Sequence, residues 1–237
     1  MTKRKPHHNP APSGCRELFD YTRQFVDVDL LMNNVPNDPG YPAYRRRWRA
    51  ILGAGIPPNS EAWKAYEISE TSTWMNADGV SEDTRYLRTR TFVNATGLAI
   101  NAATGDHDLI PTNYAAIGLI RDAESLADRD LIRRLVSAFD EIDTKLLGSY
   151  ETQAPLLLLG SLIARYMLGE PPEDVKAFVE HLMEQEQYYN SKYREFLWSC
   201  DAFRGYHAQW KTAVRRYLPE NDPLLAPLRS RLLSAEL

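Results

Sequence analysis

Apolar residues recur along this chain at steps of three and four positions, the spacing that places side chains on one face of an α-helix. The clearest example follows Asp128, an expected N-cap, with an apolar stripe made of Leu131, Leu135, Phe139, Ile142 and Leu146. Strand signals, which would alternate every second residue, do not recur. The pattern therefore predicts an all-α fold, an irregular helical bundle of about nine or ten helices.

Two helix pairs with short connections stand out in the middle of the chain. Residues 112–126 and 128–147 are expected to form one antiparallel hairpin, and residues 152–168 and 172–185 another. Leu156 to Leu159 make the third of these helices apolar nearly all round, which places it in the middle of the core. The two hairpins start about forty residues apart, so a solenoid-like helical repeat is expected, although no repeated sequence signature accompanies it.

The N-terminal region divides into a tail and a first helix. Residues 1–14 lack apolar periodicity and predict a disordered tail, so that residues 15–237 form a single helical domain. The helix is expected through residues 15–34, with one face that comprises Leu18, Tyr21, Phe25 and Val28.

Aromatic residues crowd the segment from 188 to 211. They contribute to a seam that steps by alternating threes and fours through Tyr189, Tyr193, Phe196, Cys200, Phe203, His207, Trp210, Val214 and Tyr217. This seam predicts one continuous helix of about 42 Å at 1.5 Å per residue, which ends before Pro219. Asp222 and Pro223 are then expected to begin a last short helix.

Composition narrows the class of protein. The chain has 237 residues, a net charge of −4 and 43% hydrophobic residues, which is ordinary for a globular protein and argues against a dedicated nucleic-acid binder. The first fourteen residues lack the apolar segment that a signal peptide has. The longest apolar run in the chain is too short to span a bilayer easily. We therefore expect a cytoplasmic protein that neither binds nucleic acid nor enters a membrane. Its two cysteines do not form a disulfide framework.

Charge is spread unevenly along the chain. Residues 1–50 carry nine Lys and Arg against five Asp and Glu, whereas residues 101–200 carry nine against seventeen. Arginines cluster in two short stretches, one made of Arg45, Arg46, Arg47 and Arg49 and the other of Arg85, Arg88 and Arg90. They could bind phosphate, but pairing with the acidic middle of the chain is the favoured interpretation.

Candidate chemistry is sparse. Asp106, His107 and Asp108 lie in an expected loop that could hold a metal, but a metal phosphohydrolase also needs an upstream histidine in the fold. His181 and Glu184 share a helix face without the repeated Glu-x-x-His motif of a di-iron site. His207 lies too far along the expected helix from Cys200 to act as its base. We expect no catalytic residue, no metal and no cofactor.

Acidic residues gather between positions 170 and 186. The candidate partner-binding residues are Glu173, Asp174, Glu180, Glu184 and Glu186. Glu180 and Glu184 are like charges one helical turn apart, an arrangement that costs a few tenths of a kcal/mol in an isolated helix. Such a helix could display its charge to a cationic partner, although a solvated face without a partner is the favoured interpretation of the charge pattern alone.

The stretch "ETQAPLLLLGSLIARYMLGEPPEDVKAFVEHL", with the later "WKTAVRRYLPENDPLL", resembles the helical immunity proteins that accompany bacterial polymorphic toxins. The shared features are a buried Leu-rich helix, a Gly-Pro turn, an acidic amphipathic helix and a proline-closed end, over residues 113–227. The resemblance implies a protein that neutralises one cognate toxin by direct complex formation, with no chemistry of its own.

Two other functions remain open at this point. One is a helical metal-dependent hydrolase that uses Asp106, His107 and Asp108, with His181 as a further ligand. The other is a helical scaffold or regulator that binds a peptide between helix pairs.

Overall fold

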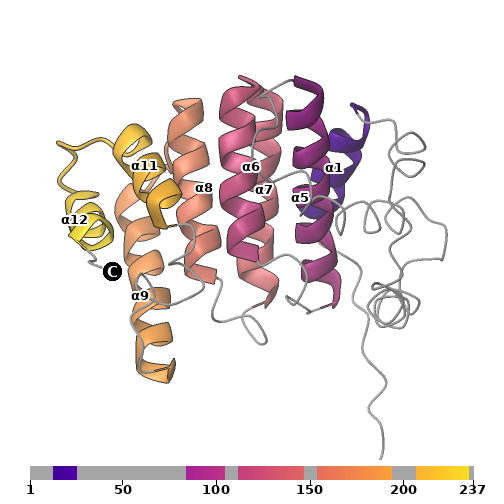
Figure 1. The fold of residues 1–237 in the computed structure, drawn as a ribbon. Coiled ribbons are helices and arrows are strands. Elements are labelled where there is room, and N and C mark those ends of the chain that lie inside the picture. Colours follow the sequence, from indigo (N-terminus) through magenta and orange to yellow (C-terminus); the bar gives the residue numbers. More distant parts are fainter. Residues whose placement is uncertain (1–12, 26–83, 105–111, 147–153, 194–206, 235–237) are drawn as a thin grey trace, which may run out of the picture.

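The computed structural model describes residues 13–25, 84–104, 112–146, 154–193 and 207–234 (Figure 1). Within these ranges the chain forms eight helices and no strand, which confirms the all-α prediction. The helices are α1 (Ser13–Arg23), α5 (Thr84–Thr104), α6 (Thr112–Ser125), α7 (Arg129–Leu146), α8 (Ala154–Leu168), α9 (Val175–Tyr193), α11 (His207–Tyr217) and α12 (Ala226–Ser234).

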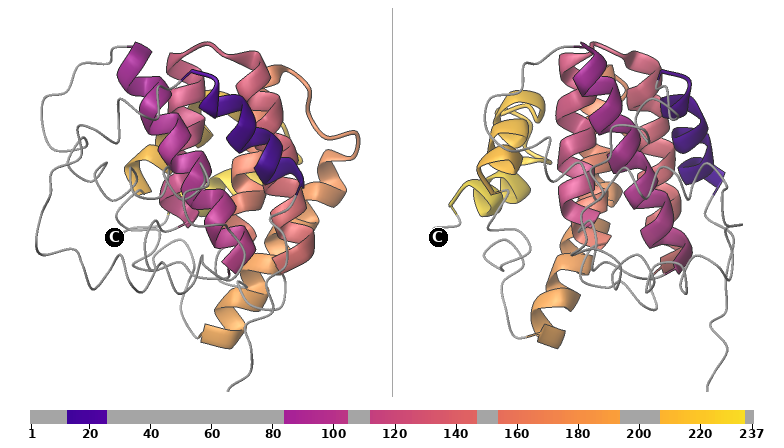
Figure 2. Two further views of the ribbon diagram at one scale, coloured as in Figure 1. Left: turned by 90° about the vertical axis from the view of Figure 1, so that its right-hand side faces the viewer. Right: turned by 45° about the vertical axis from the view of Figure 1, so that its right-hand side comes forward.

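The helices pack as a bundle that continues to one side. Helices α1, α5, α6 and α7 contact one another in a ring, in which each helix touches the next. Helix α8 packs on α6 and α7, and α9 and α11 pack on α8 in turn. Helix α12 contacts α11 at the end of the row, far from α1 (Figures 1 and 2). The expected hairpins α6–α7 and α8–α9 are both present, and extensive packing of α7 against α8 joins them.

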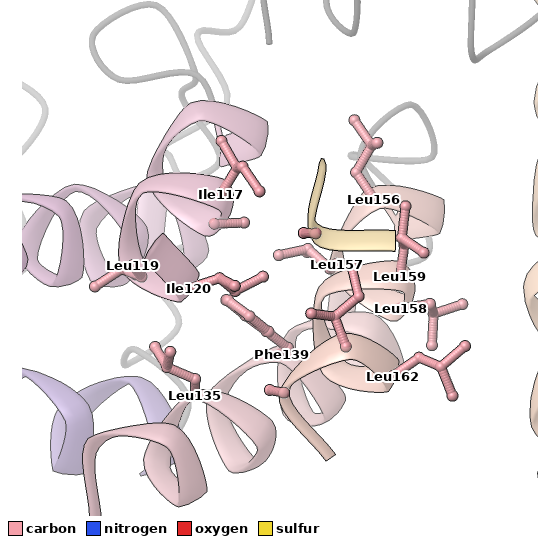
Figure 3. Close-up of a cluster of buried hydrophobic side chains, with 14 of the residues drawn as sticks. Ile117, Leu119, Ile120, Leu135, Phe139, Leu156, Leu157, Leu158, Leu159 and Leu162 are labelled. Carbon is pink, nitrogen blue, oxygen red and sulfur yellow. The ribbon is translucent and has the colours of Figure 1, made fainter. Parts of the chain in front are cut away.

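The core extends through all eight described helices, and Figure 3 shows the part of it where α6, α7 and α8 meet. The expected stripe on α7 is buried at Leu131, Leu135, Phe139 and Ile142. Leu156 to Leu159 of α8 are all buried too, as the all-round apolar pattern predicted. Phe139 reaches α8 at Gly160, where an added Cβ would lie 3.0 Å from the ring atom Cε2. Gly160 therefore makes room for the largest side chain on the α7 stripe.

Helix ends follow the capping signals in the sequence. The Leu131 N–H donates to the Asp128 carboxylate at 2.9 Å, which makes Asp128 the N-cap of α7 as expected. Asp174 caps α9 in the same way, with the Ala177 N–H 2.8 Å from its carboxylate. Helix α8 ends at Leu168, and Gly169 follows with φ of 73°, a conformation that favours glycine.

Two arginines of α5 pair with acidic residues, as the uneven charge distribution predicted. Arg90 forms an ion pair with the fully buried Asp122 of α6. Arg88 reaches Asp128 at 2.6 Å, so it joins α5 to the start of α7. The side chain of Arg85 and the run Arg45 to Arg49 lie outside the described residues.

Helix α1 begins earlier than expected, at Ser13 rather than after a tail that ends at residue 14. Glu141 of α7 holds the first turn of α1, because it accepts hydrogen bonds from the Gly14 N–H at 2.5 Å and from the Ser13 hydroxyl at 2.9 Å. Sequence periodicity does not encode a contact between such distant residues. The helix ends at Arg23, and Phe25 is 43% exposed rather than part of a buried face. Val28 lies outside the described residues.

The expected single helix through residues 189–217 is wrong. The described residues of this range belong to two helices, α9 and α11, and both contact α8. In one straight helix, the buried Leu182 and Trp210 would lie about 42 Å apart, whereas the fifteen residues of α8 span only about 22 Å. Helices α9 and α11 are therefore not parts of one straight helix. Residues 194–206, including Phe196, Cys200 and Phe203, lie outside the described residues.

The final helix starts later than expected. Helix α11 ends at Tyr217, two residues before Pro219, as predicted. Asp222 does not cap α12 directly but holds the turn that precedes it. Its carboxylate accepts from the Leu224 N–H at 2.9 Å, and its carbonyl accepts from the Leu225 and Ala226 N–H groups.

Candidate partner-binding surface

Helix α9 has an inner and an outer face. Val179, Leu182 and Glu186 are buried against the rest of the protein, and they follow the steps of three and four that define one helical stripe. The outer side carries exposed residues, namely Lys176, Ala177, Glu180, Glu184, Gln187 and Tyr188. Glu173 and Asp174 precede the helix and are exposed as well. We call Glu173, Asp174, Glu180 and Glu184 the acidic face of α9.

Glu180 and Glu184 are the two residues of this acidic face that lie within α9 itself. They lie one turn apart, so their side chains point in similar directions. Lys176 Nζ lies 3.7 Å from Glu180 Oε1, but the two side chains are 68% and 61% exposed. An ion pair this open to water contributes little, and it leaves the pair of glutamates accessible to another molecule.

Asp174 has a structural role in addition to its charge, because its carboxylate caps α9. The neighbouring Glu170 is used within the protein as well. It pairs with Arg133 at 3.2 Å and with Arg129 at 3.5 Å, both at the start of α7. Negative charge near the turn between α8 and α9 is therefore partly neutralised. The acidic side chains most accessible to another molecule are those farther along α9, Glu180 and Glu184.

Glu186 does not belong to the acidic face, contrary to the sequence prediction. Its side chain has no exposed surface, and Arg231 of α12 donates a hydrogen bond to Glu186 Oε1 at 3.0 Å. The physical reason is helical periodicity, since Glu186 follows Leu182 by one turn and so falls on the inner stripe. Successive side chains are rotated by about 100° around the helix axis. Glu184 and Tyr188 each lie two positions from Glu186, so they are rotated by about 200° from it and point outward.

Sequence reasoning missed Arg231 and Arg229. Arg229 is 8% exposed and donates to the carbonyl oxygens of Val214 and Leu218 at the end of α11, with a distance of 2.9 Å to Val214. The signal available in the sequence is their position beside Leu228 and Leu232, both buried. Two arginines within one short apolar helix indicate buried partners.

Several other acidic side chains, Asp140 and Glu124 among them, are engaged in contacts between helices, whereas Glu17 and Asp20 of α1 are exposed. Asp140 accepts from the buried Ser161 hydroxyl at 2.5 Å and from Arg165 at 2.6 Å. Glu124 of α6 pairs with Arg216, and burial together with the contact to Glu124 raises the pKa of Tyr217 above its ordinary value. These contacts stabilise the bundle, which distinguishes them from the outward charges of α9.

The described residues contain no group of three or more His, Cys, Asp or Glu side chains that could hold a metal ion. His181 is half-buried on α9, and α11 begins at His207. The loop of Asp106, His107 and Asp108 lies outside the described ranges, as does Cys200. Across the described ranges, no helix combines the length and apolar character needed to cross a membrane.

Comparison with known proteins found no matching family model, no matching curated protein and no matching solved structure.

Proposed function

We propose that this chain is a binding protein that neutralises a cognate protein toxin by forming a direct complex with it. The acidic face of α9 is the surface that we assign to the toxin. The observation that carries the proposal is the outward display of Glu180 and Glu184 one turn apart. Like charges at this spacing repel one another, and a cationic partner bound to both would offset that repulsion.

The partner that fits this surface is basic. An acidic strip attracts positively charged proteins over a distance of about 10 Å at 0.1 M salt and orients them as they approach. Toxins that act on nucleic acids carry positive charge around their active sites, because they must hold phosphates. Glutamates on α9 would occupy such a site in place of the phosphates and keep the substrate out.

Growth of bacteria that express the toxin provides the test. The protein encoded beside this gene is the candidate toxin, and co-expression of the wild-type chain should restore growth. The variant Glu180→Lys/Glu184→Lys should lose this protection. The matched control is Glu17→Lys/Asp20→Lys, which reverses two exposed charges on α1 at the other end of the bundle.

Circular dichroism should show equal helix content in all three proteins. Protection that persists in the α9 variant at the wild-type level would refute the assignment of this surface. Loss of protection in the α1 control as well would indicate a general effect of net charge rather than a binding site.

A further inference from the structure

Glu186 and Arg231 connect two parts of the chain that are forty-five residues apart in sequence. Arg231 Nη2 lies 2.9 Å from Glu186 Oε2 and 3.0 Å from Oε1. The carboxylate is fully buried, whereas the arginine side chain is 38% exposed. A buried carboxylate needs a compensating positive charge, so removal of this arginine would leave the acid in an unfavourable environment.

Helix α12 is tied to the protein by more than this pair. Leu225, Leu228 and Leu232 are buried in the core, and Arg229 donates to the last carbonyls of α11. The helix has only nine residues, too few to be stable in water alone. Its helical state therefore depends on these contacts with α9 and α11.

The C-terminal half of α9, residues 183–193, extends past the N-terminal end of α8 (Figures 1 and 2). The first half of α9 packs Val179 and Leu182 into the core. Glu186 lies at the beginning of this extension, and Glu184 of the acidic face lies two residues before it. A contact at Glu186 is well placed to fix the direction of this segment.

We propose that α12 is a latch that holds the C-terminal half of α9 in position through the Arg231–Glu186 pair. Glu186 is then a positioning residue, which acts on the acidic face from the opposite side of the helix. The consequence for toxin binding rests on the function proposed above, whereas the coupling of α12 to α9 can be measured in the free protein.

Hydrogen exchange of the full chain tests the latch directly. The variant Arg231→Met keeps most of the side-chain stem but removes the charge. Amide exchange should become about tenfold faster or more in both 226–234 and 183–193, because local opening of α12 releases α9. Exchange in α7 and the first half of α8 should stay at the wild-type rate, which shows that the bundle remains folded.

Two further variants separate the ion pair from general damage. Arg215→Met removes an exposed arginine of α11 and should leave exchange in both segments unchanged. Glu186→Met/Arg231→Met also removes the buried carboxylate that Arg231 stabilises, so it should restore slow exchange if Arg231 acts through Glu186.

The outcomes distinguish the two proposals. Wild-type exchange in 183–193 of Arg231→Met would overturn the latch, and so would a double variant that exchanges as fast as the single one. If the wild-type chain gives no protection against the candidate toxin while exchange behaves as expected, the proposed function fails and the latch stands.

Discussion

The hydroxyl of Tyr21 on α1 donates a hydrogen bond to the carboxylate of Asp128 at 2.9 Å, and this same carboxylate caps α7. Arg88 of α5 reaches the carboxylate as well, at 2.6 Å. One acidic side chain thus joins three helices of the bundle. The Arg88 guanidinium also lies 3.9 Å from the centre of the Phe25 ring, which adds a cation–π contact at the same junction.

Removal of this carboxylate should weaken the bundle measurably. We expect Asp128→Ala to lower the free energy of unfolding by about 1–3 kcal/mol, because it removes the helix cap and leaves Tyr21 and Arg88 without their acceptor. Urea denaturation measures the change. The control is Asp130→Ala, whose exposed carboxylate pairs only loosely with Arg133 at 3.3 Å; its effect should stay below about 1 kcal/mol. Equal losses in both variants would contradict this role of Asp128.

The same residue predicts a dependence of stability on pH. Burial tends to raise the pKa of Asp128, but hydrogen bonds from the Leu131 N–H, Arg88 and Tyr21 outweigh it and lower the pKa below 3.8. The unfolded chain therefore binds this proton more readily than the folded chain, so the carboxylate stabilises the fold above pH 3.8 and loses this effect as pH falls through its folded pKa. Asp128→Asn should be less stable than wild type at pH 6, and the difference should shrink as pH drops below 3.8. A difference that stays constant over this range would be inconsistent with the lowered pKa.

Gly14 should not tolerate a larger residue. A Cβ at this position would lie 2.9 Å from the backbone carbon and oxygen of Ser137, which cannot move without α7. Alanine improves helix propensity by up to about 1 kcal/mol, yet the clash should make Gly14→Ala a net loss of about 1–3 kcal/mol. Thermal unfolding compares it with Glu17→Ala, an exposed change on the same helix. A more stable Gly14→Ala protein would show that α1 does not pack this closely on α7.

Phe139 should be among the most costly core side chains to remove. It is fully buried between α7 and α8 (Figure 3), and its ring lies close to Gly160. Phe139→Ala should lower the free energy of unfolding by about 3–5 kcal/mol because it leaves a cavity. Phe139→Leu keeps more of the volume and should cost much less. Similar losses for the two variants, measured in urea, would show that packing volume is not what matters at this site.

Helical periodicity predicted the parts of the fold that depend on local pattern. The α7 stripe through Leu131 and Phe139 and the buried leucines of α8 follow directly from spacing. The cap at Asp128 follows from residue type at a helix start. Contacts between distant segments do not show in such patterns, which is why the start of α1 at Ser13, fixed by Glu141, was missed.

The candidate surface shows both the use and the limit of counting charges. Grouping acidic residues by segment placed Glu186 with Glu180 and Glu184, although the step from Leu182 puts it on the inner face. Applying the same period to acidic residues as to apolar ones would have separated them. The prediction of one helix through residues 189–217 failed for the opposite reason, because an unbroken period cannot reveal that α9 and α11 both pack on α8.

Calorimetric titration of the purified chain with the candidate toxin, the protein encoded beside its gene, measures the central proposal most directly. The outward glutamates of α9 should make the complex electrostatic, so Glu180→Lys/Glu184→Lys should bind at least about tenfold more weakly at 0.1 M salt, a change of about 1.4 kcal/mol. Glu17→Lys/Asp20→Lys should bind as tightly as wild type. Unchanged affinity after both glutamates of α9 have been reversed would contradict the account.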